Sequence, residues 1–134
     1  MTTLRYICIG YFIALMIAAS LNYIPGLTDE DGLAFGIFAL DIFDDSLHVA
    51  SALWALASAL VSHKASRFFL LVFGALYLGD GVFGFFTGYG YLDLGIFTNG
   101  SDGMSFTFQR VAANVPHLFL GGFALFSVWK LDRA

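Results

Sequence analysis

Asp45-Ser46-Leu47-His48 and Asn114-Val115-Pro116-His117 are two copies of one short pattern, and each copy leads into a long apolar stretch. In both copies a histidine follows an Asp or Asn by three residues. The same tripeptide also precedes each copy: Gly36-Ile37-Phe38 comes before the first and Gly95-Ile96-Phe97 before the second. We therefore predict that the chain is a duplicated helical hairpin.

The composition indicates a membrane protein. Of the 134 residues, 59% are hydrophobic and only 12% are charged. A soluble domain of this size cannot bury that much apolar surface, so the excess must face lipid. The net charge of -4 and the few scattered Lys and Arg residues argue against nucleic acid as a partner. The single cysteine, Cys8, excludes an intrachain disulfide and a zinc site built from several cysteines.

Four segments are long enough, or nearly so, to cross the apolar core of a bilayer, which takes about 20 helical residues. We place them at roughly 6–24, 44–62, 67–87 and 111–130. The predicted fold class is an all-α integral membrane four-helix bundle, formed by one membrane domain, residues 1–134. This domain is expected to contain two parallel-repeat helical hairpins, residues 1–64 and 65–134.

The first segment has an alternative interpretation as a secretory signal peptide. Arg5 precedes its apolar run, and the small residues Ala18-Ala19-Ser20 resemble a signal-peptide cleavage site. We expect it to be a retained helix.

The positive charges predict the orientation, because Lys and Arg resist translocation across the membrane. Five of the six cations fall near the termini or in the loop between the second and third segments. These five are Arg5, Lys64, Arg67, Lys130 and Arg133, and only Arg110 falls at the opposite end. Both termini are therefore expected in the cytoplasm, and the two longer, acidic loops outside. In the first of these loops we expect a helix start at Thr28 and a re-entrant or interfacial piece at 33–40.

Small and polar residues recur three and four positions apart in the predicted helices, a spacing that gathers them on one face. In the second segment this face comprises Asp41, Asp44, Asp45, His48, Ser51, Ala52, Ala55 and Ser62. In the fourth it comprises Asn114, His117, Gly121, Ala124 and Val128. In the first segment Gly10, Ala14 and Ala18 form a similar row, where small side chains allow another helix to approach closely.

The matched histidines define the candidate site. Parallel repeats place His48 and His117 at the same depth in the outer half of the membrane, and Asp80 reaches about that depth on the third segment. An ionisable residue there is unfavourable unless it is paired or neutral. Two imidazoles and one carboxylate suit a divalent transition metal or a proton. Supporting contacts are expected from Asp44, Asp45 and Asn114.

The same residues also have a structural interpretation, which we favour over a metal or proton site. Asp45 and Asn114 are predicted as helix N-caps, His48 and His117 occupy the third helical position, and Pro116 suits a first turn. Hydrogen bonds between helices would use the remaining polar groups. No cofactor is assigned, and a bis-His haem or a chlorin is a narrower alternative to a divalent metal.

Three segments of the sequence resemble those of a family of small bacterial four-helix membrane proteins of unknown function. They are Phe35-Gly36-Ile37-Phe38 with His48-Val49-Ala50, the run Val72-Phe73-Gly74-Ala75-Leu76-Tyr77-Leu78, and the stretch 114–121. The resemblance covers nearly all of the chain and implies the bundle fold and the bacterial inner membrane, but no activity. Here Asp44 stands where the family often has His, Asp45 where it often has Asn, and Asp80 where it has an apolar residue.

Three functions fit these observations. The favoured one is a non-enzymatic structural or accessory subunit that packs in a larger complex or a homo-oligomer, with the lipid bilayer and a protein as partners. The second is a metal, proton or cofactor site at paired His48 and His117, and the third is an oligomeric transport or channel element. An enzyme is not expected, because the sequence shows no nucleophile beside a base and no phosphate-binding glycine loop.

Overall fold

The regular structure of the chain is helical. The computed structural model describes residues 1–36, 42–92, 94, 96–97, 100, 103 and 107–133, without the side chains of Asn22 and Gln109. The elements in these ranges are α1 (Thr3–Ser20), the short 3-10 helix η1 (Leu21–Tyr23), α2 (Ile42–Val61), α3 (His63–Thr87) and α5 (Phe108–Leu131). The predicted all-α class is confirmed.

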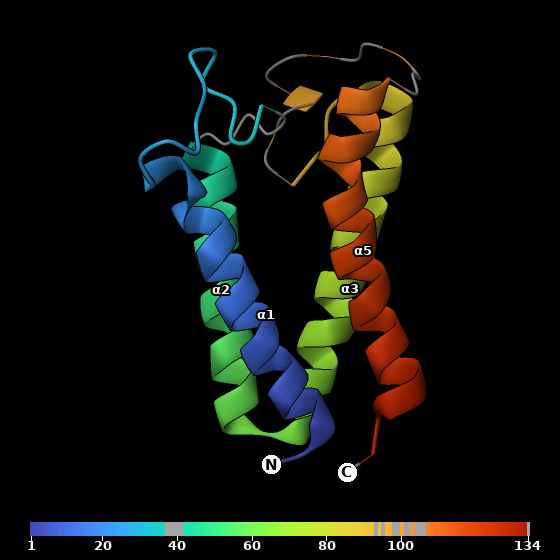
Figure 1. The fold of residues 1–134 in the computed structure, drawn as a ribbon. Helices are drawn as coiled ribbons and strands as arrows, with labels where there is room; N and C mark the ends of the chain where they lie inside the picture. The colour runs from blue at the N-terminus through green and yellow to red at the C-terminus, as the bar shows by residue number, and fades with distance from the viewer. Residues whose placement is uncertain are drawn as a thin grey trace.

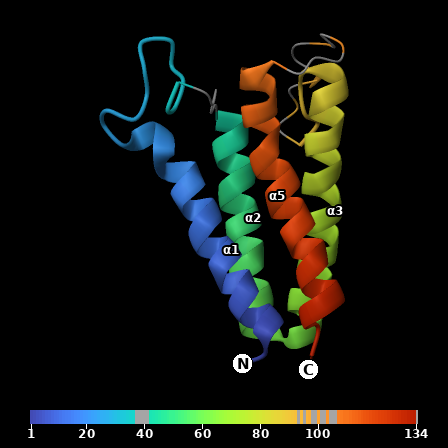
Figure 2. The same cartoon turned by 45° about the vertical axis from the view of Figure 1, so that its right-hand side comes forward.

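The four long helices run side by side, with both termini and the α2–α3 turn at one end and the longer loops at the other (Figures 1 and 2). α1 packs mainly against α2, and α3 mainly against α5. Contacts of α3 with α1 and α2, and of α1 with α5, join the two pairs. The duplication of the hairpin stays a prediction.

Three helical segments are long and apolar enough to cross a membrane: Thr3–Ser20, His63–Thr87 and Arg110–Leu131. They correspond to the first, third and fourth predicted spans. α2 does not reach the same hydropathy, because Asp44, Asp45 and His48 lie in its first two turns.

All four long helices begin before the predicted spans, and in two of them the capping residue that sets the start lies outside the apolar stretch. Ser62 caps α3, and its hydroxyl oxygen accepts a hydrogen bond from the backbone N–H of Ala65 at 3.0 Å. Thr107 caps α5 in the same way, accepting from the N–H of Arg110 at 3.3 Å.

The predicted N-caps Asp45 and Asn114 are therefore wrong. Asp45 lies inside the first turn of α2, and Asn114 lies well within α5, where its Nδ2 donates to the carbonyl of Arg110 at 2.8 Å. Pro116 also lies in the interior of α5 and not in its first turn. The apolar pattern locates the buried part of a helix, whereas its polar ends extend beyond that pattern.

The first outer loop has no helix start at Thr28. Thr28 instead pairs with Ala34 in an isolated antiparallel bridge. Between them, Oδ1 of Asp29 accepts hydrogen bonds from the backbone N–H groups of Asp31 and Leu33 at 3.0 and 2.8 Å. The carboxylate thus closes a turn, which competes with a helix for the same donors. Most of the expected re-entrant piece, 37–40, and Asp41 of the predicted α2 face lie outside the described residues.

The predicted inward faces are confirmed for the described residues of α2 and α5, apart from half-buried Ser62 and His117. The buried members on α2 are Asp44, Asp45, His48, Ser51, Ala52 and Ala55, and those on α5 are Asn114, Gly121, Ala124 and Val128. The rest of the described core between the helices is apolar apart from Asp80 and the serines Ser58, Ser66 and Ser127, and aromatic rings of α3 run along it. Phe73 stacks on Phe69 at a centroid distance of 5.1 Å and on Tyr77 at 4.0 Å.

Polar contacts fasten the end of the bundle that carries the termini. The ring of His63 lies 2.8 Å from Oγ1 of Thr2 through Nδ1 and 2.7 Å from Oδ1 of Asp132 through Nε2. Nε of Arg67 donates to Oδ2 of Asp132 at 2.8 Å. A polar clamp of Thr2, His63, Arg67 and Asp132 therefore joins the start of α1, the start of α3 and the residue after α5.

Acidification is expected to release the C-terminal end of this clamp. The hydrogen bond from Arg67 lowers the pKa of Asp132, partial desolvation opposes this, and His63 lowers the pKa further. A carboxyl group with a lowered folded-state pKa contributes stability that is complete above its unfolded value, about 3.9, and is lost as the pH falls through the folded value. The protection factors of the Asp132 and Arg133 amides, which compare the observed exchange rate with the intrinsic rate at the same pH, should therefore fall below about pH 4.

Asp132→Asn should show the low protection factors already at neutral pH, whereas Glu30→Gln in the outer loop should leave them unchanged. Wild-type protection factors in Asp132→Asn at neutral pH would contradict the role given to this carboxylate.

Candidate functional site

The most buried carboxylate within the described ranges is that of Asp80 on α3, which is only 2% exposed. Its Oδ2 lies 2.5 Å from Nδ1 of His117 on α5. Its Oδ1 accepts hydrogen bonds from the backbone N–H groups of Tyr91 at 2.8 Å and Leu92 at 2.9 Å. Both carboxylate oxygens are thus used as acceptors, and they connect α3, α5 and the loop after α3.

The contact with Asp80 assigns the tautomer of His117. An ionised carboxylate only accepts hydrogen bonds, so Nδ1 of His117 is the donor in this contact, and in the neutral ring Nε2 then has the lone pair. The His117 side chain is 21% exposed, so the ring is less enclosed than its partner.

The loop after α3 folds back over Asp80. α3 ends at Thr87 and is capped by Gly88, which has a left-handed φ of 88° and donates its N–H to the carbonyl of Gly84 at 2.9 Å. Gly90 then passes so close to Asp80 that a Cβ atom there would lie 2.5 Å from Oδ1. The hydroxyl of Tyr91 donates to the carbonyl of Leu76 at 2.7 Å, which holds the segment against α3.

Tyr77 connects this site to α2. Its ring meets the ring of His117 edge-on at a centroid distance of 5.3 Å. Its hydroxyl lies 3.4 Å from Oγ of Ser51, which belongs to the buried polar face of α2. Polar residues of α2, α3 and α5 therefore meet in one region of the bundle.

The structure brings together two of the three predicted ligands, Asp80 and His117. The carboxylate of Asp80 is hydrogen-bonded to Nδ1 of the His117 ring. His48 is buried on α2. Within the described ranges, no group of three or more His, Cys, Asp or Glu side chains is arranged to hold a metal ion. The three-ligand metal site therefore stays a prediction, without support from this geometry.

Two of the predicted supporting residues, Asp45 and Asn114, have other neighbours in the part of the chain that is described. Oδ2 of Asp45 accepts a hydrogen bond from the hydroxyl of Tyr23 at 3.1 Å. Asn114 packs against Gly84, where a Cβ atom would lie 2.0 Å from its Oδ1. Asp44 is buried near the start of α2.

Sequence reasoning missed the backbone donors of Tyr91 and Leu92. The one signal for them is the glycine pair Gly88 and Gly90 directly after an apolar helix, which allows the chain to turn back on itself.

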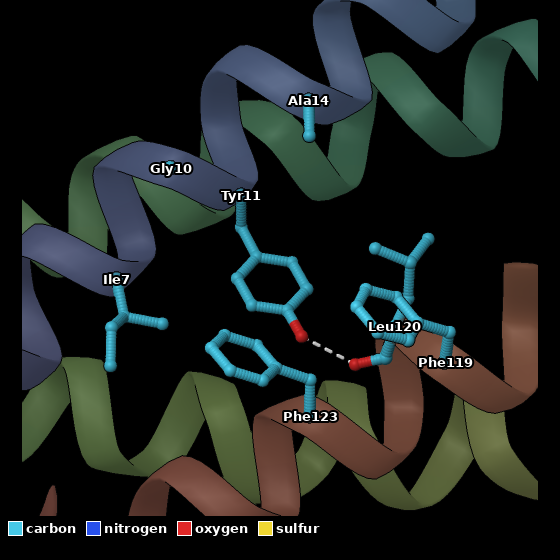
Figure 3. Close-up of a pocket in the computed structure, with 7 residues that line it drawn as sticks. All are labelled: Ile7, Gly10, Tyr11, Ala14, Phe119, Leu120 and Phe123. Atoms are coloured by element: carbon cyan, nitrogen blue, oxygen red, sulfur yellow. Dashed lines mark hydrogen bonds between the residues drawn. The ribbon is translucent and has the colours of Figure 1, made fainter.

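An apolar groove between α1 and α5 is the second notable feature (Figure 3). Its volume is about 230 Å³. It is lined by Ile7, Gly10, Tyr11 and Ala14 of α1 and by Phe119, Leu120 and Phe123 of α5. At its floor the hydroxyl of Tyr11 donates to the carbonyl of Leu120, as the dashed line in Figure 3 marks.

The glycines of the helices differ in what surrounds them. A Cβ atom on Gly74, Gly81 or Gly121 would lie within 3.0 Å of atoms of the neighbouring helix, so the bundle itself requires these glycines. A Cβ atom on Gly10 would meet nothing within 4 Å, and the same holds for Gly122. The packing of the bundle therefore does not explain why residue 10 is a glycine.

Comparisons with models of protein families, with curated proteins and with solved structures found no match. The resemblance to small bacterial membrane proteins stays a prediction. What the protein does is therefore argued from its own geometry.

Proposed function

We propose that the protein is a non-enzymatic accessory protein of the bacterial inner membrane, which packs in the membrane plane against a spanning helix of another protein. In this proposal all four long helices cross the membrane, both termini are cytoplasmic, and the two hairpins are parallel repeats. The three apolar helices support the membrane location.

The distribution of side chains on α2 supports a fourth crossing. Its ionisable residues Asp44, Asp45 and His48 are each at least nine-tenths buried among the other helices. Large apolar side chains, including Leu53 and Leu60, cover the exposed part of α2. A helix that hides its polar groups in the bundle meets lipid with an apolar surface, even though its mean hydropathy is lower.

The observation that carries the accessory role is Gly10 in the groove between α1 and α5. Glycine in a helix is less favourable than alanine by about 1 kcal/mol, and no side chain of this bundle needs the space. Gly10 and Ala14 lie one turn apart and are both exposed. Small residues at this spacing let a second helix approach closely within a membrane.

Gly10→Leu is therefore expected to block association while leaving the isolated protein folded. A photo-crosslinking residue in place of Phe119, an exposed aromatic residue that lines the groove, activated in the membranes of the producing cells, should give one adduct of defined mass in the wild-type background. We expect at least a tenfold loss of this adduct in Gly10→Leu, with an unchanged Tm of the purified protein. An adduct of twice the chain mass would identify the partner as a second copy.

Gly122→Leu is the matched control, because residue 122 also faces open space but does not line the groove. It should leave both the adduct and the Tm unchanged. Crosslinking to lipid alone, or an equal adduct in Gly10→Leu, would contradict the accessory role.

A second candidate function is the binding of a proton, a metal or a cofactor at Nε2 of His117. The observation in its favour is the carboxylate of Asp80 on Nδ1, because such a contact orients an imidazole and increases the basicity of its other nitrogen. Elemental analysis and the visible spectrum of the purified protein test it. A metal or colour that is lost in His117→Gln and kept in His63→Gln would support this function, and its absence from the wild type would count against it.

A further inference from the structure

The end of the bundle that carries both termini has exposed positive charge that the fold does not use. Lys64, Lys130 and Arg133 are exposed, and none of them forms an ion pair with another described residue. By contrast, Arg5 donates to the backbone carbonyls of Ala59 and Leu60 at 2.6 and 3.0 Å. The stability of the bundle therefore does not account for these three cations.

Negative side chains at this end are scarce. In the sequence, Asp132 is the one acidic residue after Asp102, and all others lie between residues 29 and 102. His63 and Arg67 both contact Asp132, at 2.7 and 2.8 Å. Its charge is thus balanced within the clamp, and the field of the other cations is left largely uncompensated.

Exposed aromatic residues lie next to Lys or Arg in the sequence at this end of the bundle. Tyr6 follows Arg5, Phe68 follows Arg67, and Trp129 precedes Lys130, and each ring is at least 60% exposed. The ammonium group of Lys130 lies 4.3 Å from the ring centroid of Trp129. Aromatic side chains of this kind favour the boundary between lipid headgroups and acyl chains.

We infer that this end binds the headgroups of anionic phospholipids, through Lys64, Lys130 and Arg133. The aromatic rings hold the helix ends at headgroup depth, and the three cations then face the phosphate groups of the adjoining leaflet. A lipid is favoured over free phosphate, because the exposed rings at this end, with Trp129 directly beside Lys130, offer apolar surface to acyl chains but not to a phosphate ion. The inference goes beyond the proposed accessory role and does not depend on it.

The test measures binding of phosphatidylglycerol and of phosphatidylcholine to the full chain in detergent, by native mass spectrometry. Wild type should prefer phosphatidylglycerol, and its affinity should fall as the salt concentration rises. Replacing Lys64, Lys130 or Arg133 with Gln should weaken phosphatidylglycerol binding by about fivefold for each cation removed. Arg110→Gln, at the opposite end, should not change it.

Equal affinity for the two lipids in wild type, or an unchanged affinity in the triple Gln variant, would overturn the inference. Displacement of the lipid by an equal concentration of inorganic phosphate would also overturn it, because the cations would then form a site for free phosphate. If the triple variant fails to fold, the single variants and the salt series on wild type decide the outcome.

Discussion

Replacing Asp80 with Leu is expected to destabilise the protein by about 3–5 kcal/mol, the usual effect of removing one partner of a buried charged pair. The substitution leaves Nδ1 of His117 and the backbone N–H groups of Tyr91 and Leu92 without their acceptor. Asp80→Asn should cost less, because the amide oxygen can still accept from the loop. Unfolding by SDS titration in mixed micelles would measure both losses.

Two controls separate this effect from a general loss of charge. Glu30→Gln removes an exposed carboxylate from the outer loop and should change the free energy of unfolding by less than about 0.5 kcal/mol. His117→Leu removes the other partner and should have an effect similar to that of Asp80→Leu. A loss below about 1 kcal/mol in Asp80→Leu would show that the pair does not hold α3, α5 and the loop together.

Gly121→Ala should destabilise the bundle by about 3 kcal/mol, although it adds only one methyl group. The new Cβ would lie 2.3 Å from the backbone nitrogen of Leu78 and 2.8 Å from the carbonyl oxygen of Gly74. Both are backbone atoms of α3, so no side chain can rotate away and the two helices must separate. The same unfolding measurement would show the loss.

Gly122→Ala makes the same chemical change at the next residue, where a Cβ atom meets nothing within 4 Å. It should be neutral or stabilising by up to about 1 kcal/mol, because alanine favours a helix over glycine. Equal losses in the two variants would mean that helix propensity and not the close approach of α3 and α5 controls stability here.

Much of the fold could be predicted from the periodicity of apolar and small residues. The inward faces of α2 and α5 followed from spacings of three and four, because residues so spaced share one side of any helix. The helix ends could not be placed in this way. Ser62 and Thr107 act as caps through single hydrogen bonds, and nothing in the apolar pattern distinguishes them from Asp45 or Asn114.

The candidate site was predictable in part. Residue spacing placed Asp80 and His117 at similar depth, and their pairing follows from the need of a buried carboxylate for a partner. The donors on Oδ1 come from the backbone of Tyr91 and Leu92. Every residue except proline carries such an N–H, so nothing in the sequence distinguishes the two N–H groups that bind Asp80.

The sequence by itself determined that the chain is helical and rich in exposed apolar surface, and which side of α2 and α5 turns inward, because these depend on composition and on the period of a helix. Only the tertiary structure decided that Asp80 is held by His117 and the folded-back loop, and that Gly121 is enclosed while Gly10 is open. These features depend on which residues distant in the chain come within a few ångströms of one another, and local pattern does not encode that distance.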